Sequence, residues 1–312
     1  MRFPGIVLAA MIVGTLGLAG ETSVLLDQIR IRVMTGDVSG ARQDLKQFPA
    51  AASTSPEYIE ALSWIGRGQL LTKNYKDAEE ISAQVRKLCL AKLANRKLDS
   101  NAHLAQALGA AIEVRAQAAA LDGRRDEAVV FLRQEVRRWH DTSIRPRIQK
   151  NLNLLTLEGK PAPPLDISRA LTGRKLQTLA QHAGHPVLLF FWAHWCSDCK
   201  QEIAIVQRLQ TTYGPHGLVV VAPTQHYGYI AGGVDAPRET ETRYIGEVFN
   251  HFYAGLGPVE VPLSEENFSA YGVSTTPTLV LIDARGIVRL YNPGGLSWER
   301  LSAAVGLHIG KN

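Results

Sequence analysis

The sequence predicts two domains, an all-α domain followed by an α/β domain whose central sheet is covered by helices on both faces. Before about residue 157, apolar residues recur at helical spacing and strand signals are scarce. After it, short and almost wholly apolar runs alternate with helical stretches, which is typical of buried strands in an α/β sheet. Residues 159–165 contain three prolines, which cannot continue a helix and mark a boundary. We therefore expect domains over residues 21–156 and 157–312.

The N-terminal residues have the pattern of an export signal. Arg2 is followed by an apolar stretch over residues 6–18 and by small residues before the chain turns polar. We expect residues 1–20 to be a signal peptide cleaved near its end, which predicts an extracytoplasmic protein, periplasmic or secreted. The alternative is an uncleaved membrane anchor through residues 3–20.

The composition is that of an ordinary folded protein, with 46% hydrophobic and 20% charged residues. The net charge of +5 is modest, and no basic run is interleaved with aromatic residues. A protein that binds nucleic acid normally has such a basic patch. The sequence therefore predicts no nucleic-acid partner.

The first domain is expected to consist of stacked helical hairpins. Residues 36–41, 74–78 and 123–128 each have a turn residue followed a few positions later by alanine, which allows a second helix to approach the first closely. The middle hairpin, with Trp64 and Tyr75, resembles a tetratricopeptide repeat, although the spacing of the three units is irregular. Two roles stay open for this TPR-like domain: binding a peptide partner, or plain helical packing.

The second domain is expected to form its elements in a simple order. Residues 186–193 and 217–223 read as buried strands, and residues 200–210 between them have helical spacing. Two further strands joined by a tight turn are predicted over residues 278–291. A closing helix is predicted over residues 297–307.

The chain has three cysteines, and two of them lie two residues apart just after the first predicted strand. Cys89 lies on the apolar face of a predicted helix and is expected to be a small buried residue. Cys196 lies where the next helix begins, so the helix dipole and the free N–H groups of the first turn favour a thiolate there. Cys199 is one turn further along and within bridging distance. We expect Cys196 to be exposed and the more acidic thiol, and Cys199 to lie deeper.

Three roles for this cysteine pair can be compared from the residues alone. A structural zinc site needs four ligands, and the sequence has neither a second CxxC motif nor a suitably spaced histidine pair. His194 is expected to be an exposed loop histidine, and no metal is predicted. A purely structural disulfide that closes so short a loop adds little stability. Redox chemistry is therefore the predicted role.

Three motifs of the second domain resemble a known family. They are the run FFWAHWCSDCK over residues 190–200, the proline-rich lead-in, and the segment YGVSTTPTLVLID over residues 271–283. Together, over about residues 157–308, they resemble the extracytoplasmic thiol-disulfide oxidoreductases of the TlpA/ResA type, which have the thioredoxin fold.

The resemblance implies a role for each of five residues. Cys196 is the attacking cysteine, Cys199 the resolving one, and Trp195 covers the site. Pro277 is implied to be cis and to face the cysteines, as the low cost of a cis X–Pro bond allows. The backbone of Thr276 is then free to pair with an extended substrate segment.

Some residues depart from the thioredoxin pattern. Phe190 stands where thioredoxin has a buried acid. Glu202 matches a glutamate of the TlpA/ResA type and is expected to move a proton at Cys199, unless it is only a solvated surface residue. Ser197 and Asp198 separate the cysteines, and we expect the negative charge of Asp198 to raise the pKa of the attacking thiol and to make the protein more reducing.

The segment before Pro277 is longer than in thioredoxin. It contains glycines and aromatic residues over residues 225–235 and a helical stretch over residues 239–253. These residues are expected to form either a mobile lip near the active site or a simple surface insertion.

The sequence thus predicts an exported thiol-disulfide oxidoreductase, more specifically a protein-disulfide reductase. No dissociable cofactor is expected, because the electrons are carried by the Cys196–Cys199 pair. The expected partners are protein thiols and disulfides and, by resemblance to the family, a membrane thiol-relay protein as electron donor. A thiol oxidase or isomerase remains an alternative. A peroxiredoxin-like peroxidase is disfavoured because Leu189 and Ala193 replace its proline and threonine, and a helical scaffold with an incidental redox domain is disfavoured by the intact motif.

Overall fold

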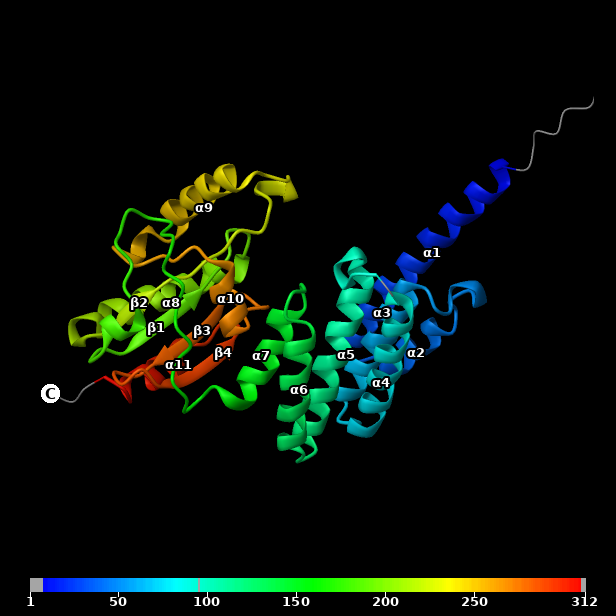
Figure 1. Ribbon diagram of the computed structural model, residues 1–312, viewed down its shortest axis with the longest axis horizontal. Coiled ribbons are helices and arrows are strands. Elements are labelled where there is room, and N and C mark those ends of the chain that lie inside the picture. The colour runs from blue at the N-terminus through cyan, green and yellow to red at the C-terminus, as the bar shows by residue number, and fades with distance from the viewer. Residues whose placement is uncertain (1–7, 95, 310–312) are drawn as a thin grey trace, which may run out of the picture. The chain divides into compact units, whose positions relative to one another are not determined.

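The computed structural model of the protein describes residues 8–94 and 96–309, with the side chains of residues 8–19 left out of the description. The chain divides into two compact units, residues 1–148 and 149–312, and each is described by itself (Figure 1). The predicted export signal falls partly outside the described residues, so export and cleavage stay predictions. None of the helices in the described ranges has the length and apolar character needed to cross a membrane.

The first unit is all-α, as predicted. Its helices are α1 (Leu8–Met34), α2 (Val38–Leu45), α3 (Pro56–Leu71), α4 (Tyr75–Leu93), α5 (Ala102–Leu121) and α6 (Arg125–Arg138), and α7 (Arg145–Thr156) crosses into the second unit.

Small side chains let these helices pack closely. The alanines of the three predicted turns, Ala41, Ala78 and Ala128, lie near the starts of α2, α4 and α6 and are all buried. The alanine-rich α5 is buried along most of its length, as expected for a helix that is apolar all round. Cys89 is also fully buried, in agreement with its predicted packing role. The tetratricopeptide resemblance itself stays a prediction.

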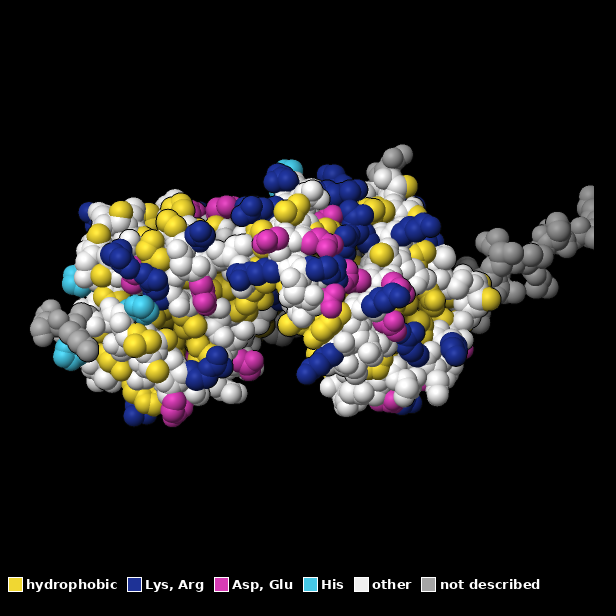
Figure 2. Space-filling model, turned by 90° about the horizontal axis from the view of Figure 1, so that it is seen from below, with side chains coloured by type: hydrophobic (Ala, Val, Ile, Leu, Met, Phe, Trp, Pro, Cys, Tyr) yellow, Lys and Arg dark blue, Asp and Glu magenta, His cyan; other side chains and the backbone are white. Residues whose placement is uncertain are grey.

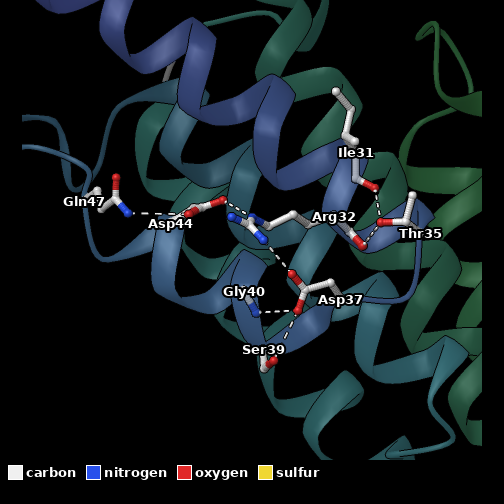
Figure 3. A network of polar contacts seen from close by, with 8 residues as sticks. All are labelled: Ile31, Arg32, Thr35, Asp37, Ser39, Gly40, Asp44 and Gln47. Carbon is white, nitrogen blue, oxygen red and sulfur yellow. Dashed lines mark hydrogen bonds and ion pairs between the residues drawn. The ribbon is translucent and has the colours of Figure 1, made fainter.

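A network of polar contacts stabilises the connection between α1 and α2 (Figure 3). The Arg32 guanidinium donates to Asp44 and to Asp37, each at 2.6 Å. Asp37 also caps α2 by accepting a hydrogen bond from the N–H of Gly40 at 2.8 Å. A capping carboxylate satisfies an N–H that has no partner within the helix. Through Arg32, these contacts join α1 to both ends of α2, at Asp37 and at Asp44.

The surface of the helical unit mixes charges of both signs, and Figure 2 shows Lys and Arg side chains lying among Asp and Glu side chains on the face in view. Ion pairs connect helices distant in sequence, for example Arg86 with Glu135 at 2.8 Å and Arg67 with Glu113 at 3.6 Å. The carboxylates of Glu135 and Glu113 are buried and their arginine partners are partly exposed, so these pairs lie where the core meets the surface.

The second unit contains a mixed four-stranded sheet. The strands β1 (Val187–Phe191), β2 (Val219–Val221), β3 (Thr278–Ile282) and β4 (Val288–Pro293) lie in the order β2-β1-β3-β4. β1 is parallel to β2 and antiparallel to β3, and β3 and β4 form the predicted hairpin. Every residue of β1 and β3 is buried, as the apolar runs predict for central strands.

Helices cover both faces of this sheet. One face packs against α8 (Ser197–Tyr213), α9 (Arg238–Phe252) and α11 (Trp298–Gly306). The other face packs against α10 (Glu265–Tyr271) and the segment that leads into β1. The alternation of side chains along β1 produces this division, because Phe190 points to the first face and Leu189 and Phe191 to the second. The predicted α/β architecture is therefore confirmed.

Candidate active site

The cysteine pair lies at the point where β1 leads into α8. Cys196 is the N-cap residue of α8, and its Sγ accepts a hydrogen bond from the N–H of Cys199 at 3.0 Å. The two sulfurs form a disulfide of 2.10 Å with a Cα–Cα distance of 5.3 Å. The first N–H groups of a helix have no partner within it and carry a partial positive charge. A helix start of this kind stabilises a thiolate at the N-cap sulfur once the disulfide is reduced.

Both cysteines are buried, which was expected for Cys199 alone. Cys196 is 3% exposed and Cys199 0%, so the prediction that Cys196 is exposed was wrong, although Cys196 is still the more accessible residue of the two. The reason is packing: Cys196 belongs to the same apolar cluster as Cys199 and Ala193. The neighbouring Trp195 is 49% exposed and lies at the surface of the site.

The peptide bond between Thr276 and Pro277 is cis, as predicted. Thr278, the first residue of β3, pairs with Phe191, the last residue of β1. This register places Thr276 and Pro277 at the end of the central strands where β1 leads into the cysteine loop. Neither backbone group of Thr276 makes a hydrogen bond within the described part of the chain, and its Oγ1 is buried there without a partner. Thr276 can therefore offer its backbone to a bound extended segment.

Glu202 is buried in α8, three residues after Cys199. Its side chain is not the solvated surface group that was the alternative expectation, because the residue is only 7% exposed. Oε1 accepts a hydrogen bond from the N–H of Leu296 at 3.0 Å. A Cβ added to Gly295 would lie 2.5 Å from Oε2, so this glycine allows the loop to approach the carboxylate. Burial raises the pKa of Glu202, and the N–H of Leu296 opposes part of that rise.

The two residues between the cysteines are exposed. Ser197 and Asp198 both lie in the first turn of α8, where the Ser197 hydroxyl donates to Asp198 Oδ1 at 3.4 Å. A carboxylate there is favourable for the helix dipole but adds negative charge near Cys196. Solvent screens this charge, so its effect on the thiol is expected to be modest.

His194 was wrongly expected to be an exposed loop histidine. Its side chain is 1% exposed, and Nε2 lies 3.6 Å from Oε1 of Glu241, which is longer than a hydrogen bond. Three tyrosine rings meet the imidazole edge-on at 5.4–5.5 Å, those of Tyr227, Tyr229 and Tyr244. Burial lowers the pKa of His194, while the Glu241 carboxylate acts in the opposite direction.

These partners come from the segment that the sequence singled out as a lip or an insertion. We use the name lip for residues 225–235. Its Tyr227 ring contacts the Trp195 ring at 5.5 Å, so the lip lies beside the cysteine loop. Glu241 and Tyr244 share one face of α9, three residues apart. That spacing, with tyrosines alternating in the lip, is the signal by which sequence reasoning would have found this group.

Two further observations bear on the chemistry. The described residues contain no group of three or more His, Cys, Asp or Glu side chains placed to hold a metal ion. Leu189 and Ala193 are both fully buried and apolar at the positions where a peroxidase needs polar and proline residues.

Comparisons with known proteins agree with this geometry. Residues 174–308 match the family model of the thioredoxin-like domain. The thiol-disulfide oxidoreductase ResA of Geobacillus thermodenitrificans is 28% identical over 141 residues, which cover 45% of this chain and 72% of ResA. The thiol:disulfide interchange protein DsbE of Xylella fastidiosa (strain Temecula1) is 27% identical over 146 residues, 46% of this chain and 66% of DsbE.

A solved structure resembles about half of the chain. The crystal structure of a thiol:disulfide interchange protein of the thioredoxin family from Chlorobium tepidum has 20% sequence identity and a TM-score of 0.38, covering 49% of this chain and 98% of that one. The sequence relatives, the matched domain and the cysteine geometry lead to one conclusion. The chain carries a thioredoxin-like domain, with Cys196 and Cys199 as its CxxC pair, and its homologues are thiol-disulfide oxidoreductases of the ResA and DsbE type.

Proposed function

We propose that the protein is an extracytoplasmic protein-disulfide reductase that uses Cys196 and Cys199 as its redox pair. One observation carries the proposal: the Cys196 sulfur caps α8 and accepts the Cys199 N–H at 3.0 Å, with the second sulfur within bonding distance. This arrangement stabilises a thiolate at Cys196 and keeps its resolving partner in place. The export pattern of the N-terminal residues supports an extracytoplasmic location.

The reaction consists of two exchange steps. In the reduced protein the Cys196 thiolate attacks one sulfur of a substrate disulfide, forming a mixed disulfide and releasing the other substrate sulfur as a thiolate that takes up a proton. Cys199 then loses its proton and attacks the Cys196 sulfur. The intramolecular disulfide forms, the second substrate thiol leaves, and two electrons have passed from the cysteine pair to the substrate.

Glu202 is the proposed proton acceptor for the second step. It lies one helical turn after Cys199 on the same helix, and burial raises its pKa. A carboxyl group with a raised pKa exchanges protons closer to neutral pH than an ordinary one, which suits a general base for a buried thiol.

Three residues are proposed to bind the substrate. An extended segment next to the target disulfide would pair with the free backbone groups of Thr276, beside the cis Pro277. The half-exposed Trp195 would contact the same segment. No dissociable cofactor is part of this proposal, because the cysteine sulfurs hold the electron pair. A membrane thiol-relay protein is the proposed electron donor.

The direction of electron flow is proposed from Asp198. Its negative charge near Cys196 disfavours the thiolate, and a dithiol whose thiolate is less stabilised is the stronger reductant.

The test compares two activities of the full chain. The wild-type protein, kept reduced with dithiothreitol, should accelerate reduction of insulin disulfides, and it should consume hydrogen peroxide no faster than a Cys196→Ser variant. Cys89→Ala, which changes the buried cysteine of the helical unit, is the matched control and should keep the insulin activity. Peroxide consumption that depends on Cys196, without insulin reduction, would identify a peroxidase instead. Equal insulin reduction by wild type and Cys196→Ser would leave only a scaffold role.

A further inference from the structure

A buried carboxylate outside the cysteine motif holds the lip in place. Glu241 of α9 is 0% exposed, and its oxygens accept hydrogen bonds from the backbone N–H groups of Tyr227 at 2.5 Å and Gly228 at 3.0 Å. A buried carboxylate needs such donors, because burying its charge without them is costly. Glu241 therefore fixes the lip backbone to α9 at Tyr227 and Gly228.

The side chain of Tyr227 transmits this attachment to the active site. Its ring meets the rings of His194 and Trp195 edge-on, each with centroids 5.5 Å apart. These two residues immediately precede Cys196 in the chain. The backbone position that Glu241 holds is thus the one that places an aromatic ring against the segment carrying the attacking sulfur.

His194 contacts the same residues of the lip and of α9. Its Nε2 lies 3.6 Å from Glu241, its ring contacts those of Tyr229 and Tyr244, and its side chain is almost completely buried. The cysteine loop, the lip and α9 therefore pack around one imidazole. If the two hydrogen bonds of Glu241 are weakened, the lip keeps the contact of His226 with Thr242 at 2.8 Å. It loses the attachment of its backbone at Tyr227 and Gly228, where it meets the loop.

We propose that Glu241 is a positioning residue for exchange with protein substrates: it holds Tyr227 against Trp195, so that the two rings form one aromatic wall beside Cys196 that binds an apolar side chain next to the substrate disulfide. Trp195 is 49% exposed, so the ring that Tyr227 contacts is open to solvent. Aromatic rings held rigidly bind apolar groups at low entropic cost. The inference rests on the proposed reductase function.

The wall predicts selectivity between substrates of different size. A protein segment that enters beside Cys196 contacts the wall as well as the backbone of Thr276. A small disulfide such as hydroxyethyl disulfide needs to reach only the sulfur. Loss of the wall should therefore lower the kcat/KM for insulin more than the kcat/KM for hydroxyethyl disulfide, and the loss should appear mainly in KM.

The test uses the full chain with Glu241→Gln. Glutamine keeps one acceptor oxygen but sets an NH2 group against the second lip N–H, so one of the two hydrogen bonds is lost. The ratio of the two kcat/KM values, insulin over hydroxyethyl disulfide, should fall about tenfold, as expected for a hydrogen bond to a charged group. Glu247→Gln is the matched control, since Glu247 lies exposed on the same helix, and it should leave the ratio at its wild-type value.

A second variant separates positioning from general damage to the fold. Tyr227→Leu removes the ring itself and should lower the same ratio, and it tests the wall even if Glu241→Gln fails to fold. Because Glu241 acts through Tyr227, the double variant should lose little more than either single variant. Additive losses, or a fall in both kcat/KM values that leaves the ratio unchanged, would overturn the inference. Wild-type protein that reduces neither disulfide would defeat the proposed function, and the inference with it.

Discussion

Oε1 of Glu202 lies 3.0 Å from the backbone nitrogen of Leu296, and this hydrogen bond joins α8 to the loop before α11. The two residues are 94 positions apart in the chain. The N–H of Leu296 stabilises the charged form of this buried carboxylate. Burial disfavours that form more strongly, so the pKa of Glu202 is raised. A titratable group of this kind lies one turn beyond the resolving cysteine.

Glu202→Gln should slow the resolution of the mixed disulfide while leaving the first attack nearly unchanged. The amide cannot accept the proton of Cys199, and general-base catalysis is worth a factor of about a hundred or more. Rapid acid quenching with mass spectrometry measures both steps in a single turnover. Because the pKa of Glu202 is raised, resolution should accelerate with pH above the usual carboxyl range, and this dependence should be lost in the variant. The exposed Glu299→Gln is the control. Equal slowing of both steps would contradict the assigned role.

Replacing each active-site cysteine in turn should give variants that accumulate different amounts of mixed disulfide. Cys199→Ser should accumulate a covalent complex with insulin that a small thiol dissolves, because the mixed disulfide on Cys196 can no longer be resolved. Cys196→Ser should accumulate little. In the reduced protein, Cys196 should be alkylated faster than Cys199, since it caps the helix and its residue is 3% rather than 0% exposed. Faster alkylation of Cys199 at neutral pH would reverse the two roles.

Asp198→His should shift the reduction potential toward oxidising values. The change removes a negative charge near Cys196 and supplies a group that can be positive, which favours the thiolate. For the wild type we expect a potential of about −270 mV or lower, measured by equilibration with glutathione or dithiothreitol. Asp198→Asn, which only removes the charge, should shift it less. The side chain is exposed, so added salt should reduce both shifts. A wild-type value of about −120 mV, as in a strong oxidant, would contradict the reductase assignment.

Asp283→Asn should destabilise the second unit at neutral pH but not in acid. The Asp283 carboxylate accepts from the N–H groups of Arg285 and Ile287 at 2.9 and 3.0 Å and from Arg289 at 2.8 Å. Burial by itself raises the pKa of Asp283, and these donors more than offset it, lowering the pKa to about 2.

The sign of the effect follows from that shift. The folded-state pKa lies below the unfolded one, so the stabilisation is present above pH ~4 and is lost as the pH falls toward ~2. Asp283→Asn should cost about 2 kcal/mol of the free energy of unfolding at pH 7 and little at the acid end. Urea unfolding of the protein, followed by tryptophan fluorescence at both pH values, measures this difference. The exposed Asp235→Asn should show no such loss. A loss of the same size at both pH values would show that charge is not the cause.

The order of elements and the chemistry of the motif were determined by the sequence alone. Apolar runs predicted β1, β2 and the β3–β4 hairpin, and the helical spacing predicted α8 and α11, because these patterns reflect local periodicity. The CxxC spacing predicted the pairing of Cys196 with Cys199, and the resemblance to the TlpA/ResA type implied the cis bond before Pro277. The export signal, the domain limits, the TPR-like role and the electron donor stay predictions.

Burial around the motif was decided only by the tertiary structure. The sequence placed His194 and Cys196 at the surface and left Glu202 open between a proton carrier and a surface group, whereas all three are buried. Each is covered by residues far along the chain: the lip and Glu241 enclose His194, and the loop at Leu296 encloses Glu202. Solvent exposure and pKa depend on the groups that surround a side chain in space, and the spacing of residues within one segment carries no information about segments that fold against it.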